Sequence, residues 1–227
     1  MKKKLIINPQ KKGGVFKSGL TLLLADYLIQ NKTNLKVFDI DNRNATTARF
    51  KSLNATFIDT KQSNDILDSI FEAFDSNDIV IVDVGAGTAE NILEWIKEVD
   101  LISVLNDNNI ELNVLIPITM VKDSVAGLKD ILTILGKSPK YIVILNEYLG
   151  NDFSIFLNSK TKQSLDETTH ILLTLPKLND KMLAYMDKNN FTLSDALDSQ
   201  LPILDKQRLT TIKKTIHPIF DQFNLFS

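Results

Sequence analysis

Near its N-terminus the chain reads Lys12-Gly13-Gly14-Val15-Phe16-Lys17-Ser18. This glycine-rich turn follows an apolar, strand-like run at 4–8 and precedes Gly19 and a helix-like apolar run at 20–28. A turn between a buried strand and a helix leaves main-chain N–H groups free at the positive end of the helix dipole, which favours phosphate. Lys17 is long enough to reach β- and γ-phosphates, and the Ser18 hydroxyl can ligate Mg²⁺. The stretch therefore predicts a phosphate-binding loop.

The alternative interpretation of this stretch is a Gly-Gly turn flanked by solvated lysines. It does not explain why a strand, a turn, a Lys-Ser pair and an apolar helix follow one another in that order. We therefore favour nucleotide binding.

Composition sets limits on the other functions that the chain could have. At 227 residues, with 44% hydrophobic and 24% charged residues, it fits one α/β domain over residues 1–227. The formal net charge of −2 gives no global reason to expect nucleic-acid binding. The absence of cysteine excludes a thiol nucleophile, disulfides and thiolate ligation of an iron–sulfur cluster. With two histidines and no cysteine, a structural zinc site is not expected.

The three lysines at 2–4 do not open a signal peptide, because a short apolar run at 5–7 is followed directly by Asn8-Pro9. No run approaches the roughly 18 apolar residues that a membrane span requires. We expect a cytoplasmic protein without stable membrane insertion.

Apolar runs of strand length alternate with segments of helical spacing, which predicts right-handed crossovers and a largely parallel sheet. The predicted strands cover residues 4–8, 35–39, 55–58, 78–83, 111–118, 140–145 and 170–175. The fold expected is α/β, with three layers: a mostly parallel central sheet of about seven strands and helices on both faces. Asp123 is expected to cap a helix that ends near Gly136. From about 179 to 227 the sequence becomes helical and amphipathic, although Pro218 should interrupt the last helix.

Carboxylates follow two of the predicted strands. Asp39 ends the predicted strand at 35–39 and Asp41 follows it two residues later, and Asp83 directly follows the apolar run at 79–82. In doubly wound folds ligands bind beyond the carboxyl ends of the strands, so these side chains suit Mg²⁺ and an attacking water. The alternative is that these acids are ordinary turn residues without such a role, whether Asp39 and Asp41 are considered as a pair or Asp83 is considered alone. Gly85 and Gly87 would give the loop after Asp83 its mobility.

The stretch at 12–18 resembles the deviant Walker A motif of the ParA/MinD family, whose usual form is KGGxGK followed by Ser or Thr. The resemblance implies that Lys12 contacts phosphate across an ATP-dependent homodimer interface and that Lys17 is the ordinary phosphate lysine. It implies that Asp41 positions water, that Asp39 lies near the Mg²⁺ shell and that Asp83 holds Mg²⁺ through water, as in a Walker B motif. The implied catalytic residues are Lys12, Lys17 and Asp41, and the implied metal residues are Ser18, Asp39 and Asp83.

The resemblance extends to the nucleotide base. In this family an asparagine after a later strand contacts the base, which implies this role for Asn146. The next strand-to-loop segment of the family lines the base pocket, which implies this position for Pro176. The residues implied to bind ATP are Lys12, Gly13, Gly14, Val15, Phe16, Lys17, Ser18, Gly19, Asn146 and Pro176.

Phe16 departs from the family pattern, which has glycine at this position. Glycine lets the main chain approach phosphate and accepts positive φ. A bulky residue in a left-handed conformation costs roughly 1–2 kcal/mol. Phe16 is therefore compatible with nucleotide binding only if its side chain points away from the nucleotide.

Segments at 39–47, 145–150 and 191–197 resemble the plasmid TraL/MobD/StbB branch of the same family, although the usual D-x-D-P is D-x-D-N here. The resemblance implies an ATPase that is slow and partner-stimulated, acting in plasmid maintenance and partition or in conjugative transfer with a plasmid-encoded partner protein. The alternatives are a non-hydrolysing pseudo-ATPase that docks a partner and a dethiobiotin-synthetase-like ligase, against which Lys12 argues.

The last helical segment carries four basic and two acidic residues between 201 and 227. Three interpretations remain open: a packing helix with a solvated basic face, which we favour; non-specific contact with DNA phosphates; and a membrane-surface helix.

Overall fold

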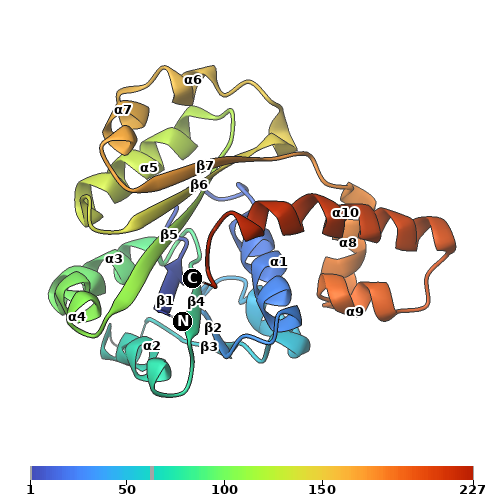
Figure 1. Ribbon diagram of the computed structural model, residues 1–227, viewed down its shortest axis with the longest axis horizontal. Helices are drawn as coiled ribbons and strands as arrows, with labels where there is room; N and C mark the ends of the chain where they lie inside the picture. Colours follow the sequence, from blue (N-terminus) through green and yellow to red (C-terminus); the bar gives the residue numbers. More distant parts are fainter. Residues whose placement is uncertain (1, 62–63, 227) are drawn as a thin grey trace.

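The computed structural model describes residues 2–61 and 64–226, and within them seven strands form one sheet (Figure 1). The strands are β1 (Lys3–Ile7), β2 (Leu35–Asp39), β3 (Thr56–Phe57), β4 (Ile79–Asp83), β5 (Ile110–Ile118), β6 (Lys140–Asn146) and β7 (His170–Leu175). Their order is β3-β2-β4-β1-β5-β6-β7. All six neighbouring pairs are parallel, so the carboxyl ends of the strands meet at one edge. The predicted sheet is confirmed.

Helices cover both faces of this sheet. They are α1 (Lys17–Gln30), α2 (Asp68–Glu72), α3 (Ala89–Glu98), α4 (Leu101–Asp107), α5 (Lys122–Leu135), α6 (Ser154–Leu157), α7 (Lys160–Asp166), α8 (Asp180–Asn189), α9 (Leu193–Asp198) and α10 (Ile203–Asp221). Five short 3₁₀ helices accompany them, namely η1 (Thr47–Arg49), η2 (Lys51–Leu53), η3 (Asn64–Leu67), η4 (Ala73–Asp75) and η5 (Glu147–Leu149). In Figure 1 α1 and α8–α10 lie on one side of the sheet, and α2–α7 lie on the other.

The central strand β4 shows why two cores form. Its apolar side chains alternate between the faces, with Val80 and Val82 in one core and Ile79 and Ile81 in the other. All four are essentially buried, as expected for a parallel strand covered by helices on both faces.

The C-terminal helix α10 packs as part of the core. Its residues Leu209, Ile212, Ile216 and Phe220 are buried in the same cluster as the apolar face of α1. A membrane-surface helix needs an apolar face exposed to lipid, so this packing argues against that interpretation. No helix in the described ranges is both long enough and apolar enough to cross a bilayer.

Two local predictions about helix ends were wrong. Pro218 does not interrupt α10, which continues to Asp221, because the packing of its apolar face outweighs the loss of one main-chain hydrogen bond. Asp123 does not cap α5: the N-cap is Val121, and Asp123 lies in the first turn. The predicted end of α5 is confirmed, since Gly136 is its C-cap with φ 66°.

Candidate phosphate-binding site

The loop after β1 leads directly into α1, at the edge of the sheet where the strands end. The first helical hydrogen bond in α1 runs from the Leu20 N–H to the Phe16 carbonyl at 3.0 Å. The N–H groups of residues 17–19 therefore have no carbonyl within the helix to bond. Gly14 and Phe16 both adopt left-handed conformations, with φ 73° and 74°. Successive main-chain N–H groups near a left-handed turn are a common feature of anion-binding loops.

Lys17 closes this loop on itself. Its Nζ donates to the main-chain carbonyl of Lys12 at 3.0 Å, and the residue is only 8% exposed. Burial lowers the pKa of Lys17, and the nearby carboxylates of Asp83 and Asp41 act in the opposite direction. The ammonium group of Lys17 thus lies inside the loop, bonded to the Lys12 carbonyl and near the carboxylates of Asp83 and Asp41.

Most of the other predicted loop residues are more exposed than Lys17. Gly13 and Gly14 are exposed, Val15 is buried, and Ser18 and Gly19 are half-buried. Lys12 extends sideways, and its Nζ lies 3.0 Å from Oδ2 of Asp123 in α5. Both side chains of this ion pair are exposed, so the pair contributes little to stability and can exchange for another partner.

Asp83 lies at the centre of a buried hydrogen-bond network. Its Oδ1 accepts from Nδ2 of Asn8 at 3.2 Å and from the Thr21 hydroxyl at 3.3 Å. Its Oδ2 accepts from the Thr47 hydroxyl at 2.5 Å. The carboxylate therefore connects β1, α1 and η1 at the end of β4.

Asp39 sits beside Asp83 in the parallel register of β2 and β4. It accepts from the N–H groups of Asp41 and Ala48, each at 2.9 Å, and is fully buried. Burial raises the pKa of Asp39 to about 6, and the negative charge of Asp83 adds to this rise. Asp39 thus holds the turn after β2 in place.

Asp41 organises the same turn. Its Oδ1 accepts from the Arg43 N–H at 3.0 Å, and its carboxyl group faces the glycine loop after β4, where a Cβ on Gly85 would come within 2.6 Å of it. A cavity of about 270 Å³ opens beside it, with Gly87 and Asn91 in its wall. Water has room next to this carboxylate.

The oxygen donors near the loop fit Mg²⁺. Ser18 offers a hydroxyl, and Asp39 and Asp83 offer carboxylates at the ends of adjacent strands. Within the described ranges no three acidic, histidine or cysteine side chains form a ready metal cluster. Mg²⁺ commonly binds through one or two carboxylates together with waters and substrate phosphates, so such a cluster is not required.

Asn146, predicted to contact a base, lies next to the loop. Its Nδ2 donates to the Val15 carbonyl at 3.2 Å, and its Oδ1 accepts from the Tyr148 N–H at 3.1 Å. Asn146 therefore connects the end of β6 to the 12–18 loop. Pro176 follows β7 and is exposed. Contact of either residue with a base remains a prediction.

Sequence reasoning missed four buried polar residues that support the site. Besides Asn8, Thr21 and Thr47, these include Gln10, whose Nε2 donates to the Ser124 carbonyl at 2.9 Å and whose Oε1 accepts from the Lys12 N–H at 3.3 Å. The Gln10 side chain can pack against α5 because residue 127 of that helix is glycine. A Cβ at Gly127 would lie 1.8 Å from Oε1 of Gln10. The available signals were the position of Asn8 directly after β1 and of Thr21 one helical turn after Lys17.

Phe16 is accommodated in the strained conformation considered above. It is the N-cap residue of α1, with φ 74° and ψ 29°, and is half-buried. Its ring lies against Gly19, where a Cβ would come within 2.2–2.5 Å of three ring carbons. Gly19 is therefore required by the position of the Phe16 ring.

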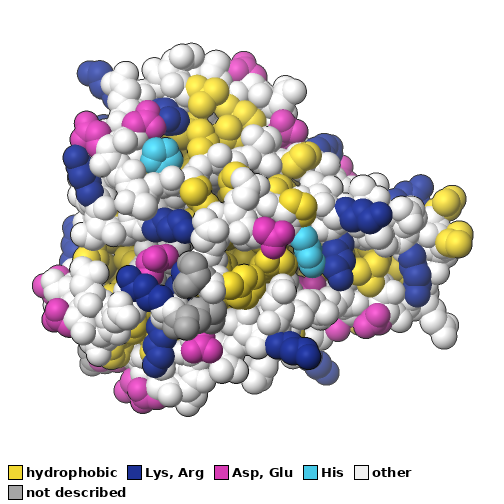
Figure 2. Space-filling view, viewed as in Figure 1, with side chains coloured by type: hydrophobic (Ala, Val, Ile, Leu, Met, Phe, Trp, Pro, Cys, Tyr) yellow, Lys and Arg dark blue, Asp and Glu magenta, His cyan; other side chains and the backbone are white. Residues whose placement is uncertain are grey.

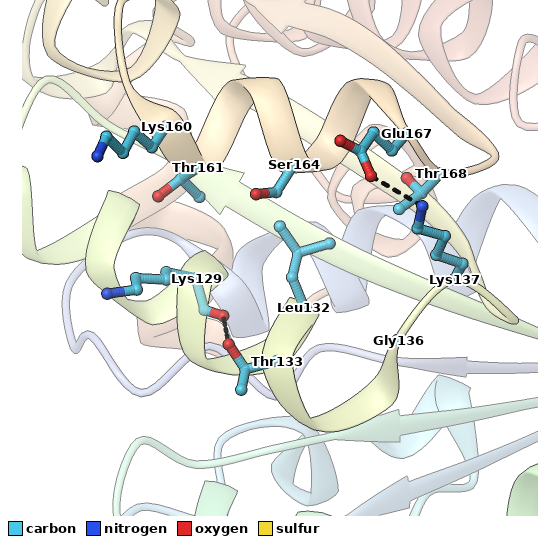
Figure 3. Close-up of a pocket in the computed structure, with 10 residues that line it drawn as sticks. All are labelled: Lys129, Leu132, Thr133, Gly136, Lys137, Lys160, Thr161, Ser164, Glu167 and Thr168. Carbon is cyan, nitrogen blue, oxygen red and sulfur yellow. Dashed lines mark hydrogen bonds and ion pairs between the residues drawn. The ribbon is translucent and has the colours of Figure 1, made fainter.

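A separate cavity of about 560 Å³ lies between α5 and α7 (Figure 3). It contains none of the predicted site residues. Of the lysines that line it, Lys137 is bound to Glu167 at 2.8 Å. We assign no function to this cavity.

Comparisons with known proteins agree with this architecture, although no protein-family model matches the chain. A curated relative named protein TraL, from Escherichia coli, is 26% identical over 220 residues, covering 90% of this chain and 91% of the relative. Among solved structures, MinD of Pyrococcus horikoshii complexed with Mg-ADP has a TM-score of 0.52 and 12% identity, covering 96% of this chain and 97% of that one. A plasmid partition protein of Borrelia burgdorferi bound to AMPPNP has a TM-score of 0.52 and 14% identity, covering 95% and 98%. The chain therefore has the fold of the MinD and ParA-type P-loop ATPases.

Proposed function

We propose that this chain, as one domain over residues 1–227, binds ATP with Mg²⁺ in its 12–18 loop and acts as a slow, ATP-dependent dimerisation switch in the cytoplasm. The observation that carries the proposal is the placement of Lys17. Its ammonium group is held inside a glycine-rich loop at the N-terminus of α1, close to Asp83 and Asp41. A buried cation and helix amides on one side, and carboxylates on the other, suit a phosphate chain with its metal.

Each site residue has a role in this proposal. Lys17 would exchange the Lys12 carbonyl for phosphate oxygens, and the amides of residues 13–19 would bind the phosphates. Ser18 would ligate Mg²⁺ directly and Asp83 through water, with Asp39 supporting that shell, while Mg²⁺ would neutralise the charge that develops on phosphate. Asp41 would orient the attacking water. Asn146 and Pro176 would border the base.

Lys12 is proposed to act between subunits. Its exposed ion pair with Asp123 can be replaced by a phosphate of nucleotide bound to a second copy of the chain. Two copies would then be held together while ATP is intact and would separate after hydrolysis. A cation supplied in trans is an established way of stabilising charge in phosphoryl transfer.

The biological setting proposed is plasmid maintenance and partition or conjugative transfer, with a plasmid-encoded partner protein. The similarity to a protein named TraL and the shared fold with a plasmid partition protein support this setting.

Non-specific DNA contact through α10 is a further proposal about partners. Figure 2 shows several basic side chains on the arm that contains α8–α10. Arg208 is already paired with Asp205 at 2.6 Å, so Lys206, Lys213 and Lys214 would carry the contact. Binding should then weaken steeply as salt is raised, and binding that is insensitive to salt would exclude phosphate contact.

The direct test is calorimetric titration of the chain with ATP and Mg²⁺, comparing the wild type with Lys17→Met. Removing the ammonium group should weaken ATP binding by about 100-fold or more. Lys11→Met is the control for loss of a lysine near the loop: Lys11 makes an exposed ion pair with Glu90 at 2.9 Å and lies outside the predicted loop. Equal ATP affinity of Lys17→Met and the wild type would exclude the loop as the nucleotide site.

The second candidate function is a non-hydrolysing module that binds nucleotide and docks a partner. The strained Phe16, at a position where glycine is usual, favours it. Phosphate release measured with ATP, DNA and the partner protein separates the two candidates: bound ATP without turnover would identify the non-hydrolysing module.

A further inference from the structure

The side chain of Phe16 lies on the side of α1, in the wall of a cavity. Its ring contacts Gly19, where a Cβ would come within 2.2–2.5 Å of three ring carbons, and packs against the apolar cluster shared by α1 and α8–α10. The cavity, of about 450 Å³, lies between α1, α8 and the segment at 46–50. Because Phe16 is only half-buried and lines this cavity, part of its ring is free to contact a ligand there.

The cavity begins at the 12–18 loop and has the lining of a pocket for an aromatic ligand. Phe16 and Gly19 connect it to the loop, and Leu22, Phe50 and Leu183 give it apolar walls. Pockets of this size, mostly apolar with a few polar groups, are typical of small-molecule sites. A nucleotide with its phosphates at the loop carries its base only one ribose away, so the base can reach this cavity.

The ends of β6 and β7 border the same cavity. Tyr148 lines it and is positioned by Asn146, whose Oδ1 accepts from the Tyr148 N–H at 3.1 Å. Asn146 is only 2% exposed, and its Nδ2 donates to the Val15 carbonyl at 3.2 Å. The amide of Asn146 is thus engaged with the main chain, and the side chains of the cavity wall are better placed to meet a base.

The charged side chains at this cavity do not oppose an anionic nucleotide. The carboxylates of Asp180 and Asp187 line it, and each has a cation beside it. Asp180 is paired with Lys177 at 3.0 Å, and Asp187 with Arg49 at 2.9 Å. These pairs offset the negative charge near the cavity.

We propose that the cavity between α1 and α8 takes the base of the nucleotide and that the Phe16 ring stacks against it, which makes Phe16 a specificity-determining residue for purine nucleotides. The inference rests on the proposed nucleotide function and names the residue that recognises the base. Stacking on an aromatic side chain contributes to affinity for any base, and a purine offers two rings for it. This contact would offset the strain of the left-handed conformation of Phe16.

The experiment compares two ligands by calorimetric titration in Mg²⁺: ATP, and inorganic tripolyphosphate, which has three linked phosphates and no base. The wild type should bind ATP about tenfold more tightly than tripolyphosphate. Phe16→Leu keeps a Cβ, and with it the strain of the left-handed conformation, but removes the aromatic ring. It should weaken ATP binding about tenfold and leave tripolyphosphate binding unchanged, whereas Phe16→Tyr should bind both ligands like the wild type.

Filling the cavity tests the place of the base without changing Phe16. Ala184 is exposed on α8 and lines the cavity, and leucine adds volume there without an aromatic ring. Ala184→Leu should weaken ATP binding about fivefold and leave tripolyphosphate binding unchanged. Lys188→Leu is the control, because Lys188 is exposed on the same helix but outside the cavity lining.

CTP tests the preference for a purine. The wild type should bind ATP more tightly than CTP, because cytosine offers one ring for stacking and adenine two. Phe16→Leu should narrow the ratio of the two affinities. An equal ratio in the wild type and in Phe16→Leu would show that Phe16 does not select the base.

The outcomes separate the base pocket from the proposed function. If Phe16→Leu binds ATP like the wild type, or if it weakens ATP and tripolyphosphate equally, nucleotide binding stands and the stacking role of Phe16 is wrong. If Ala184→Leu binds ATP like the wild type, the base lies outside this cavity. If the wild type binds neither ligand at millimolar concentration, the proposed function fails and the base pocket with it.

Discussion

The hydroxyl of Thr47 donates to Oδ2 of Asp83 at 2.5 Å and joins the segment after β2 to the end of β4. The opposite oxygen of Asp83 accepts from Asn8 and Thr21, so one carboxylate connects four parts of the site. Movement of the segment after β2 therefore changes the hydrogen bonds of Asp83 and, through Thr21, those of α1. This coupling is what a nucleotide-controlled switch requires, because under the proposed function phosphate and metal would bind where these parts meet.

Asn8 should be the most sensitive polar residue of this network. Its Nδ2 donates to the Thr21 hydroxyl and to Oδ1 of Asp83, and its Oδ1 accepts from the Val84 N–H at 3.0 Å. Asn8→Ala leaves the buried Val84 N–H without this acceptor, at about 1–3 kcal/mol, and removes one donor each from Thr21 and Asp83, which keep their bond to each other. We expect a large fall in the free energy of unfolding, measured by urea denaturation.

The control for Asn8 is Asn31→Ala at the exposed end of α1, where Nδ2 donates to the Tyr27 carbonyl at 2.8 Å. The side chain remains close to water there, so the loss should be below about 1 kcal/mol. Equal denaturation midpoints for the two variants would show that the buried network does not hold the site together.

Lys12→Ala should separate dimerisation from folding. Its exposed ion pair with Asp123 contributes at most about 1 kcal/mol, so the thermal midpoint should stay close to that of the wild type. The ATP-dependent dimer should be lost, as measured by light scattering after size-exclusion chromatography. Lys11→Ala removes a similar ion pair, that with Glu90, and should still dimerise. Normal dimerisation of Lys12→Ala with ATP would contradict a contact in trans.

The sheet could be predicted from the sequence because its signal is local and repeated. Apolar runs such as 79–82 have the length and flanking residues of buried strands, and the alternation with helices fixes a parallel arrangement. The position of the 12–18 loop between a strand and a helix could be predicted for a related reason, since its glycines, Lys17 and Ser18 are adjacent in the chain; phosphate binding by this loop stays a prediction.

The polar network could not be predicted, because its members come from distant segments. Thr47 and Asp83 are 36 residues apart, and Gln10 and Ser124 are 114 apart. The errors at Asp123 and Pro218 have a similar origin. Local preference favoured a cap at Asp123 and a break at Pro218, whereas α5 begins earlier, with Val121 as its N-cap, and the packing of α10 carries that helix past Pro218.

Asp41→Asn should separate hydrolysis from binding. An asparagine oxygen can still accept from the Arg43 N–H, although its amide nitrogen cannot accept from Nδ2 of Asn44, so the turn after β2 should keep its main-chain contact and lose one side-chain bond. Loss of the negative charge that orients water should slow ATP turnover by about 100-fold while ATP affinity changes little. Turnover is measured as phosphate release and affinity by calorimetry. Unchanged turnover would remove Asp41 from the catalytic residues.

Titration of Asp39 should make the free energy of unfolding depend on pH. Burial raises its pKa in the folded chain to about 6, above the ordinary aspartate pKa of 3.8 that represents the unfolded chain. Between these two values the folded state binds more protons than the unfolded state, so the contribution of Asp39 to stability falls as pH rises through this window. Above about pH 6 the loss is complete, on the order of 3 kcal/mol.

The measurement is the difference in unfolding free energy between the wild type and Asp39→Asn from pH 4 to pH 8. Asparagine does not titrate, so any constant effect of its amide on the Asp41 and Ala48 N–H groups cancels from the pH dependence. The wild type should lose stability relative to Asp39→Asn up to about pH 6, and the difference should then stay constant. Mg²⁺ with ATP should reduce this slope, because a cation beside Asp39 favours the ionised carboxylate. A difference that does not change with pH would show that Asp39 titrates as an ordinary carboxyl, and a slope indifferent to Mg²⁺ and ATP would place the metal elsewhere.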